Sequence, residues 1–264
     1  GPNGAGKTTT TRILLDLARP TSGEVEVLGL DPHTHGAETR AQIGYVPERT
    51  DIGYGWMRVD RLLEHHAAFR TGWDADYARE LSDALEVETT KKFGKLSKGN
   101  ARRVQLLMAL AHKPRLLILD EPTDGLDPMV RRDVLTAVLD YVAETGATVF
   151  ISSHLVHELE RICDWVGVLD HGRLVAELPI HAFKSGVKRI RVAGAPPEPG
   201  DTPFVVLSRL EDELALGETW IVRGWQDPMR QYFEGVGASV RDVIDLDLEE
   251  VFVELLRSSR RVER

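Results

Sequence analysis

The sequence predicts an α/β protein in which a parallel sheet is flanked by helices. Two observations lead to this fold class. Residues 116–122, LLILDEP, form a short continuous apolar run that closes on two acids, which is typical of a strand buried on both faces. From there to residue 170, strand-like and helix-like segments alternate, and this alternation favours a parallel sheet with helices on both faces.

The predicted elements follow one another along the chain. Residues 9–18, TTTRILLDLA, have helical spacing and stop before Pro20, whereas residues 24–30, EVEVLGL, alternate as in a short strand. Residues 42–48, QIGYVPE, are another strand-like piece. Further helices are expected at 102–114, near 128–144 and near 155–163, and further strands at 147–153 and 165–170.

The organisation into domains follows from changes in composition. We expect a main domain at 1–185, with a helical insertion at 49–100, and a small α+β appendage at 186–264. Residues 195–203, APPEPGDTP, are expected to form a linker or loop, followed by the strand-like pieces FVVLSRL and TWIVRG. A final helix carries an apolar stripe, and Asp247 and Glu250 are placed as its capping box.

The composition limits the function. The 264 residues are 42% hydrophobic and 28% charged, and 33 Lys+Arg against 42 Asp+Glu give a net charge of −9, which argues against wholesale nucleic-acid binding. The single cysteine, Cys163, excludes a disulfide framework and fits a reducing cytosol. No apolar run approaches the roughly 18 residues that a membrane-spanning helix needs, so a membrane role requires a partner.

The chain opens with a candidate phosphate-binding loop, because Gly1, Gly6, Lys7 and Thr8 match the pattern G-x-x-x-x-G-K-[ST]. The glycines let backbone N–H groups turn onto phosphate oxygens, and the following helix adds its positive N-terminus. Lys7 supplies a charge for the β- and γ-phosphates, and the Thr8 hydroxyl can ligate Mg²⁺. Such a loop normally follows a strand, so we expect this sequence to be truncated at its N-terminus.

Two further motifs carry chemistry. Asp120 at the end of the apolar run can hold Mg²⁺ through water, and the adjacent Glu121 can polarise an attacking water. The segment LSKGN at 96–100 opens a helix. Because a helix N-terminus carries partial positive charge, Ser97 and the Gly99 backbone form an anion site there. Taken alone, the acids fit a surface pair and Ser97 fits an ordinary N-cap.

Taken together, these motifs and three others occur in an order that resembles one protein family. GPNGAGKTT, YVPE, LSKGN, LLILDEP, TDGLDP and ISSH occur in one order, each at a strand–helix junction. This order resembles the nucleotide-binding subunit of ATP-binding-cassette (ABC) transporters, of the bacterial exporter type, from Gly1 to about Ala176. The resemblance implies a P-loop NTPase fold, binding of ATP and Mg²⁺, and ATP hydrolysis. LSKGN is its most diagnostic element.

The resemblance also implies roles for matching residues. The phosphate cradle comprises Gly1, Pro2, Asn3, Gly4, Ala5, Gly6, Lys7, Thr8 and Thr9. Thr8, Glu48 and Asp120 are implied as Mg²⁺ ligands, Glu121 as general base, and His154 as sensor of the γ-phosphate. Ser97, Lys98 and Gly99 grip the γ-phosphate bound by a second subunit, and Asp127 crosses between the two sites. Hydrolysis then needs a head-to-tail dimer, and the insertion after Glu48 docks on a transmembrane permease.

Three positions depart from the family's pattern. Glu48 replaces a glutamine, and a carboxylate can ligate Mg²⁺ but cannot donate a hydrogen bond unless protonated. Lys98 replaces a glycine and Asn100 a glutamine. For Lys98 we weigh attraction of phosphate against exposure to solvent and favour solvent, because lysine is mostly exposed.

Three hypotheses follow. The first is an ATPase subunit of a transporter, cytoplasmic and peripheral on the inner face of the membrane, with a homodimeric arrangement and no nucleic-acid partner. The second is a soluble ABC ATPase that acts on DNA or ribosomes, although the paired cassettes, coiled-coil insertions and zinc-binding cysteines typical of those relatives are missing from this sequence. The third is a non-hydrolysing fragment. The transported substrate and the direction of transport are not readable from the sequence.

Overall fold

The computed structural model describes residues 1–156, 160, 162–194, 202–212 and 217–262. The chain forms two compact units, one of residues 6–154 and one that joins residues 1–5 to residues 155–264. The predicted boundary between domains at 185/186 stays a prediction.

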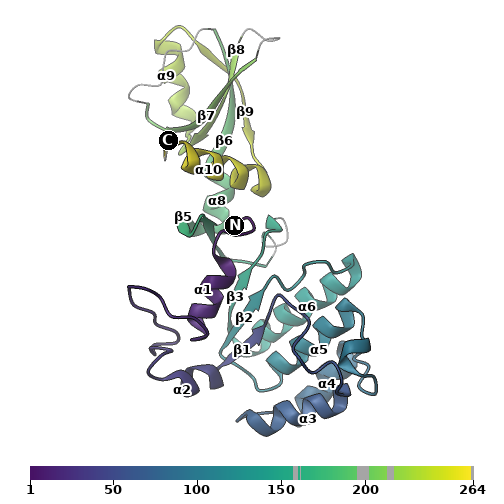
Figure 1. The fold of residues 1–264 in the computed structure, drawn as a ribbon. Helices are drawn as coiled ribbons and strands as arrows, with labels where there is room; N and C mark the ends of the chain where they lie inside the picture. Colours follow the sequence, from purple (N-terminus) through teal and green to yellow (C-terminus); the bar gives the residue numbers. More distant parts are fainter. Residues whose placement is uncertain (157–159, 161, 195–201, 213–216, 263–264) are drawn as a thin grey trace. The chain divides into compact units, whose positions relative to one another are not determined.

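A parallel sheet lies at the centre of the 6–154 unit (Figure 1). Its strands are β1 (Ile43–Val46), β2 (Leu116–Asp120) and β3 (Thr148–Ser152), in the order β1-β2-β3 and all parallel. Every residue of β2 is buried. Because the carboxyl ends of parallel strands share one edge, the register places Asp120 beside Ser152 at that edge.

Helices cover both faces of β2, as the alternation of its side chains requires (Figure 1). On one face, Leu116 and Ile118 pack with Leu15, at the C-terminal end of α1 (Lys7–Leu14). On the other face, Leu117 and Leu119 pack with α5 (Lys98–Leu110) and α6 (Pro128–Thr145). The prediction of a parallel sheet between helices is confirmed for this unit.

The remaining elements of this unit are mostly helical. They are α2 (Gly36–Ala41), α3 (Val59–Phe69), α4 (Ala75–Ala84) and a 3-10 turn, η1 (Phe93–Lys95). The last three lie in the segment where the sequence predicts a helical insertion, and Val59 and Leu62 of α3 pack with Val104 of α5. None of the described helices is long and apolar enough to cross a membrane.

One predicted strand of this unit is wrong. Residues 24–30 do not form a strand, and Val27 and Leu30 instead make an isolated antiparallel bridge. Leu28 and Gly29 both have positive φ, +55° and +82°, so the chain reverses directly after Val27. The alternation of valines therefore marks one arm of a tight turn.

The second unit begins with a hairpin of β4 (Trp165–Asp170) and β5 (Arg173–Pro179). Residues 165–170 form the predicted strand, but it pairs antiparallel with β5 and is not part of the parallel sheet. Asp170 and Arg173 are cross-strand partners in that register, so a short turn brings the chain straight back. Of the helix expected near 155–163, residues 157–159 and 161 lie outside the described ones.

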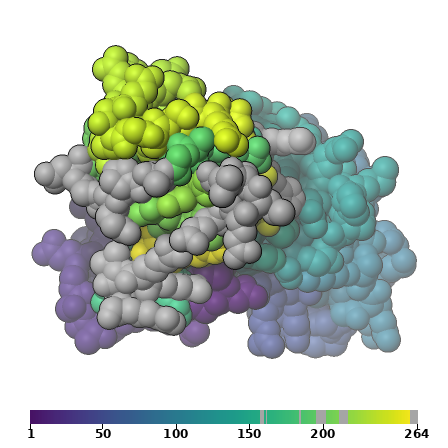
Figure 2. All heavy atoms as spheres, turned by 90° about the horizontal axis from the view of Figure 1, so that it is seen from above, coloured from purple at the N-terminus to yellow at the C-terminus, as the bar shows by residue number. Residues whose placement is uncertain are grey.

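An antiparallel sheet forms the rest of this unit, in the order β7-β8-β6-β9. Its strands are β6 (Val187–Ala193), β7 (Val205–Asp212), β8 (Gly217–Arg223) and β9 (Ser239–Asp245). The helices are α8 (Ile180–Ser185), α9 (Arg230–Gly235) after a 3-10 turn, η2 (Asp227–Met229), and α10 (Leu248–Val262). In the space-filling view, yellow-green atoms of the α9–β9 segment lie against green atoms of the preceding strands (Figure 2).

The sequence anticipated β7, β8 and α10 but not β5, β6 or β9. The capping box of α10 is present: the Glu250 N–H donates to Asp247 Oδ1 at 2.8 Å, and the Asp247 N–H donates to Glu250 Oε2 at 3.1 Å. Buried Trp220 and Phe233 anchor an aromatic core in this unit. Most of the expected loop at 195–203 lies outside the described residues.

Candidate nucleotide site

The loop that opens the chain has the backbone geometry of a phosphate cradle. Gly4 and Gly6 have φ of +79° and +109°, a region that glycine adopts without strain. Within residues 1–5, the Ala5 N–H donates to the Pro2 carbonyl at 3.2 Å, while the side chain of Asn3 is exposed. Gly6 is the N-cap of α1, so Lys7, Thr8 and Thr9 form its first turn, where the dipole favours anions.

Two predicted residues of the 6–154 unit converge on the carboxylate of a third, Glu121. Lys7 Nζ lies 3.1 Å from Glu121 Oε1, and both side chains are about nine-tenths buried. His154 approaches the other oxygen, Oε2, with its Nδ1 at 2.8 Å and its backbone N–H at 3.2 Å. Glu121 is thus held from two sides by residues that the sequence places 114 and 33 positions away.

The strand ends create this arrangement. Glu121 follows β2 in a left-handed conformation, with φ of +47°, and its N–H donates to the carbonyl of Ser152 at 3.1 Å. This bond continues the β2–β3 ladder by one residue, while the unusual φ turns the side chain out of the strand's alternation. A non-glycine residue at positive φ is uncommon, and strained backbone of this kind clusters at active sites and ligand-binding loops.

Asp120 supplies the acceptor that a divalent cation needs. Its side chain is fully buried, and Oδ1 accepts a hydrogen bond from the Ser152 hydroxyl. The other oxygen, Oδ2, is buried without a hydrogen-bond partner among the described residues. Because an unsatisfied buried carboxylate oxygen is costly, this atom fits a hydrated Mg²⁺ ion, a hard cation that takes oxygen ligands. Burial, and next the charge of Asp120, raise the pKa of Tyr45.

The loop after β1 is attached to α5. Glu48 itself is exposed, but its carbonyl accepts from Arg102 at 2.7 Å, and Arg102 also donates to the Pro47 carbonyl. Gln105, one turn further along α5, donates to the Arg49 carbonyl at 2.9 Å. Sequence reasoning missed Arg102 and Gln105. The sequence carried one signal, because Arg102 and Gln105 are polar residues within a mostly apolar helical segment. In the structure, residues 101–110 of that helix are all buried.

The predicted signature residues lie at the start of α5. Ser97 is the N-cap, and its hydroxyl accepts from the Asn100 N–H at 3.2 Å. A Cβ on Gly99 would lie 3.1 Å from Val130 of α6, so glycine lets the two helices approach closely. Asp127 caps α6 in turn, accepting from the N–H of Val130 at 3.1 Å.

Lys98 is exposed, as expected, and it also makes a specific contact. Although its side chain is 43% exposed, Nζ donates to Asp124 Oδ2 at 3.1 Å, and Asp124 belongs to the TDGLDP segment. The positively charged group also lies over Gly125, whose φ is +63°. The lysine that departs from the family's pattern thus contacts the turn before α6.

The structure therefore gathers the predicted residues of this unit into groups. Lys7, Glu121, Asp120 and His154 meet at the carboxyl end of β2 and β3. Ser97, Lys98, Gly99 and Asp127 lie at the adjoining N-termini of α5 and α6, and Glu48 lies on the loop that α5 holds. Ser152 and Asp124 contact these groups and were quoted in the motifs without a role.

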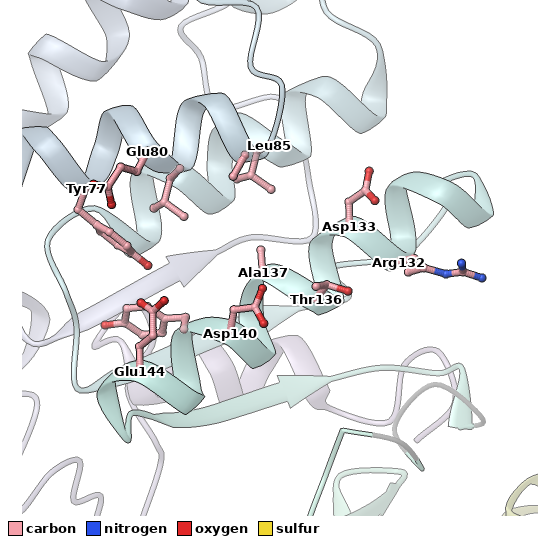
Figure 3. A pocket seen from close by; sticks show the side chains of 12 residues that line it. Tyr77, Glu80, Leu85, Arg132, Asp133, Thr136, Ala137, Asp140 and Glu144 are labelled. Atoms are coloured by element: carbon pink, nitrogen blue, oxygen red, sulfur yellow. The ribbon is translucent and has the colours of Figure 1, made fainter.

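A hollow of about 350 Å³ lies elsewhere in this unit, between α4 and α6 (Figure 3). Tyr77 and Leu85 line it from α4 and its C-terminal end, and Asp140 and Glu144 line it from α6. Burial, and then carboxylates that include Glu144, Glu80 and Asp140, raise the pKa of Tyr77 to about 12. A hollow with this negative potential does not suit a polyphosphate, and it contains no predicted site residue.

A glycine loop before a helix, a lysine and two strand-end carboxylates define a P-loop protein of the ATP-binding class. Comparison with known proteins identifies the family within this class. Residues 1–124 match the family model described as "ABC transporter". The chain is 34% identical over 207 residues to the Nod factor export ATP-binding protein I of Rhizobium sp. (strain N33), covering 75% of this chain and 67% of that protein. The chain belongs to the ABC transporter family, among its ATP-binding subunits.

Two further similarities extend this result. The ABC transporter ATP-binding protein YtrB of Bacillus subtilis (strain 168) is 28% identical over 266 residues, covering 99% of this chain and 88% of that protein. A dimeric post-hydrolysis structure of the ATP-binding cassette MJ0796, bound to ADP and Pi, has a TM-score of 0.60 and 25% identity, covering 68% of this chain and 83% of that chain. The chain spans about six-tenths of the length of several other curated relatives.

Proposed function

We propose that this chain binds and hydrolyses ATP and thereby energises transport through a separate transmembrane permease. The observation that carries the proposal is the contact of Lys7 and His154 with one buried carboxylate, Glu121, beside the unsatisfied oxygen of Asp120. ATP hydrolysis is a general property of this family, and the departures at Glu48, Lys98 and Asn100 leave Lys7, Asp120, Glu121 and His154 in place.

The proposed reaction assigns a role to each group. Glu121 accepts a proton from water, the water oxygen bonds to the γ-phosphorus, and the bond from that phosphorus to the β–γ bridging oxygen breaks, which releases ADP and phosphate. Lys7 binds the β- and γ-phosphate oxygens, so it must exchange Glu121 for phosphate when ATP enters. His154 orients Glu121 and contacts the γ-phosphate.

Mg²⁺ fits the donors at this site. Asp120, the Thr8 hydroxyl and Glu48 would hold it, and when bound it supplies positive charge to the phosphate oxygens. The Ser152 hydroxyl fixes the Asp120 carboxylate by occupying Oδ1, which leaves Oδ2 for the cation or its water.

The signature group is proposed to act on a second copy of the chain. Ser97, Lys98 and Gly99 would contact the γ-phosphate bound by the partner, and Asp127 would lie between the two sites. The dimeric cassette with ADP and Pi supports this arrangement by similarity. A homodimer, docked through the helices after Glu48 on a permease at the inner face of the membrane, completes the proposal.

Affinity capture with the wild-type protein tests the transport assignment. With ATP turnover measured on the same preparation, we expect phosphate release and recovery of an integral membrane protein. Recovery of ribosomal RNA or DNA instead would favour a soluble ABC ATPase. Binding of ATP without any phosphate release would favour a non-hydrolysing fragment.

A further inference from the structure

Arg102 is a buried cation whose role the reaction above leaves open. Its side chain is fully buried, and no described carboxylate lies within ion-pair distance of it. Its guanidinium instead donates to the Pro47 and Glu48 carbonyls and to Gln105 Oε1, the last at 3.1 Å. A buried charge is costly unless it is well hydrogen-bonded, so the burial of Arg102 depends on these hydrogen bonds.

The contacts of Arg102 form a regular pattern with those of Gln105. Arg102 binds the carbonyls of residues 47 and 48, and Gln105 Nε2 binds those of residues 49 and 50, at 2.9 and 3.5 Å. Two side chains, three positions apart on α5, therefore hold four successive carbonyls of one loop. The Arg102–Gln105 bond fixes the two side chains relative to each other.

The neighbouring arginine behaves differently and provides a comparison. Arg103 points toward α6, where it pairs with Asp133 at 2.5 Å, and toward Glu86 at 3.6 Å. Among the described residues, its hydrogen-bond and ion-pair partners are Asp133 and Glu86, and neither lies in the 47–50 loop. The two consecutive arginines of α5 therefore have different partners. Arg102 binds the loop that carries Glu48, and Arg103 binds helix α6.

We propose that Arg102, supported by Gln105, is a positioning residue that sets the Glu48 carboxylate for Mg²⁺·ATP by holding the backbone of residues 47–50. The inference rests on the proposed function, because Glu48 matters only if this site takes Mg²⁺·ATP.

The electrostatic environment agrees with this role. Burial lowers the pKa of Arg102, and the charges of Asp124, Asp120 and Glu48 act in the opposite direction, so these carboxylates lie within electrostatic reach. An arginine keeps its charge in such a place because its unperturbed pKa lies far above neutral pH. It therefore provides a permanent donor set for loop carbonyls beside an anion-binding site.

The experiment measures ATP affinity by calorimetry with Mg²⁺ and with EDTA, for wild type, Arg102→Met, Gln105→Leu and the matched control Arg103→Met. We expect Mg²⁺ to tighten ATP binding in the wild type and in Arg103→Met. In Arg102→Met this Mg²⁺-dependent gain should fall about tenfold, the size of effect typical of outer-shell groups. Affinity in EDTA should stay within about twofold of wild type in every variant that has a cooperative thermal transition.

A double variant separates positioning from general damage. If Arg102 acts through Glu48, then Arg102→Met should cause no further loss of the Mg²⁺-dependent gain in a Glu48→Ala background. Gln105→Leu should give a smaller loss of the Mg²⁺-dependent gain. If Arg102→Met lacks a cooperative thermal transition, Gln105→Leu is the test variant in its place. Equal losses in the Arg102 and Arg103 variants, or additive losses in the double variant, would overturn the inference. Absence of ATP binding by the wild type would instead overturn the proposed function.

Discussion

Lys7 Nζ lies 3.1 Å from Glu121 Oε1, so the residue proposed to bind phosphate forms an ion pair with the residue proposed to activate water. The contact couples the first turn of α1 to the end of β2. We expect ATP to replace this contact, because its phosphate oxygens would compete for the same ammonium group. In the proposed mechanism, Glu121 would then become available as a base when the substrate binds.

The Lys7–Glu121 contact makes the two residues energetically dependent on each other. Lys7→Met leaves a mostly buried carboxylate with His154 as its remaining partner, so we expect a loss of about 1–3 kcal/mol in the free energy of unfolding. With Glu121→Gln added, the combined loss should be smaller than the sum by at least about 0.5 kcal/mol. Urea unfolding of the four proteins measures this, and strict additivity would contradict a direct interaction.

Ser152 should control metal dependence through Asp120. Ser152→Ala removes the described donor to Asp120 Oδ1 and frees the carboxylate to rotate. We expect the Mg²⁺ concentration for half-maximal ATP hydrolysis to rise about 10-fold or more, with little change in ATP affinity in EDTA. Ser153→Ala, at the next residue, is the control. A metal requirement that is unchanged in Ser152→Ala would refute this role.

The exposed Lys98–Asp124 pair should contribute little to stability. Both side chains are about two-fifths exposed, and such pairs are worth about 0–1 kcal/mol. Lys98→Ala should therefore change the free energy of unfolding by less than about 1 kcal/mol, whereas Arg103→Ala, which removes a mostly buried arginine, should cost more. Chemical denaturation compares them, and a larger loss for Lys98→Ala would show that the pair has a structural role.

Stability should fall in mild acid because of His112. Its Nε2–H donates to the Ile43 carbonyl at 3.1 Å, and burial, then the charge of Arg70, lower its pKa from 6.5 to about 4. The unfolded chain therefore binds a proton below about pH 6.5 that the folded protein does not bind until about pH 4. The contribution of neutral His112 is complete above that window and is lost as the pH falls through it.

His112→Gln tests this assignment, since its amide keeps a donor for Ile43 but does not titrate. The free energy of unfolding should depend less steeply on pH between about 6.5 and 4 in the variant than in the wild type. Urea titrations at several pH values give the comparison. Parallel pH curves for the two proteins would show that His112 does not contribute.

Much of the nucleotide unit could be predicted because its motifs are local. The apolar run before Asp120 specifies a buried strand, and its central position in a parallel sheet follows from the alternation with helices. The site residues on strand ends follow from the same reasoning. Their roles stay predictions, whereas their convergence on Glu121 is now described.

What the sequence could not provide depends on contacts between distant residues or on local turns. The positive φ at Leu28 and Gly29 converts an alternating stretch into a turn, and alternation alone carries no sign of that reversal. Likewise, nothing near Arg102 in the sequence indicates that its acceptors lie 54 and 55 residues away. The antiparallel pairing of β4 was missed because pairing direction depends on a partner strand, β5, that was not anticipated.

The most direct measurement of the central claim compares wild type with Glu121→Gln in the presence of Mg²⁺ and ATP. Phosphate release, retained nucleotide and oligomeric mass are recorded on the same samples. The account predicts that the variant loses turnover by at least about 100-fold, retains ATP and accumulates as a dimer, because binding and closure persist without the base. Normal phosphate release by Glu121→Gln would contradict the assignment of Glu121, and with it the proposed chemistry of the site.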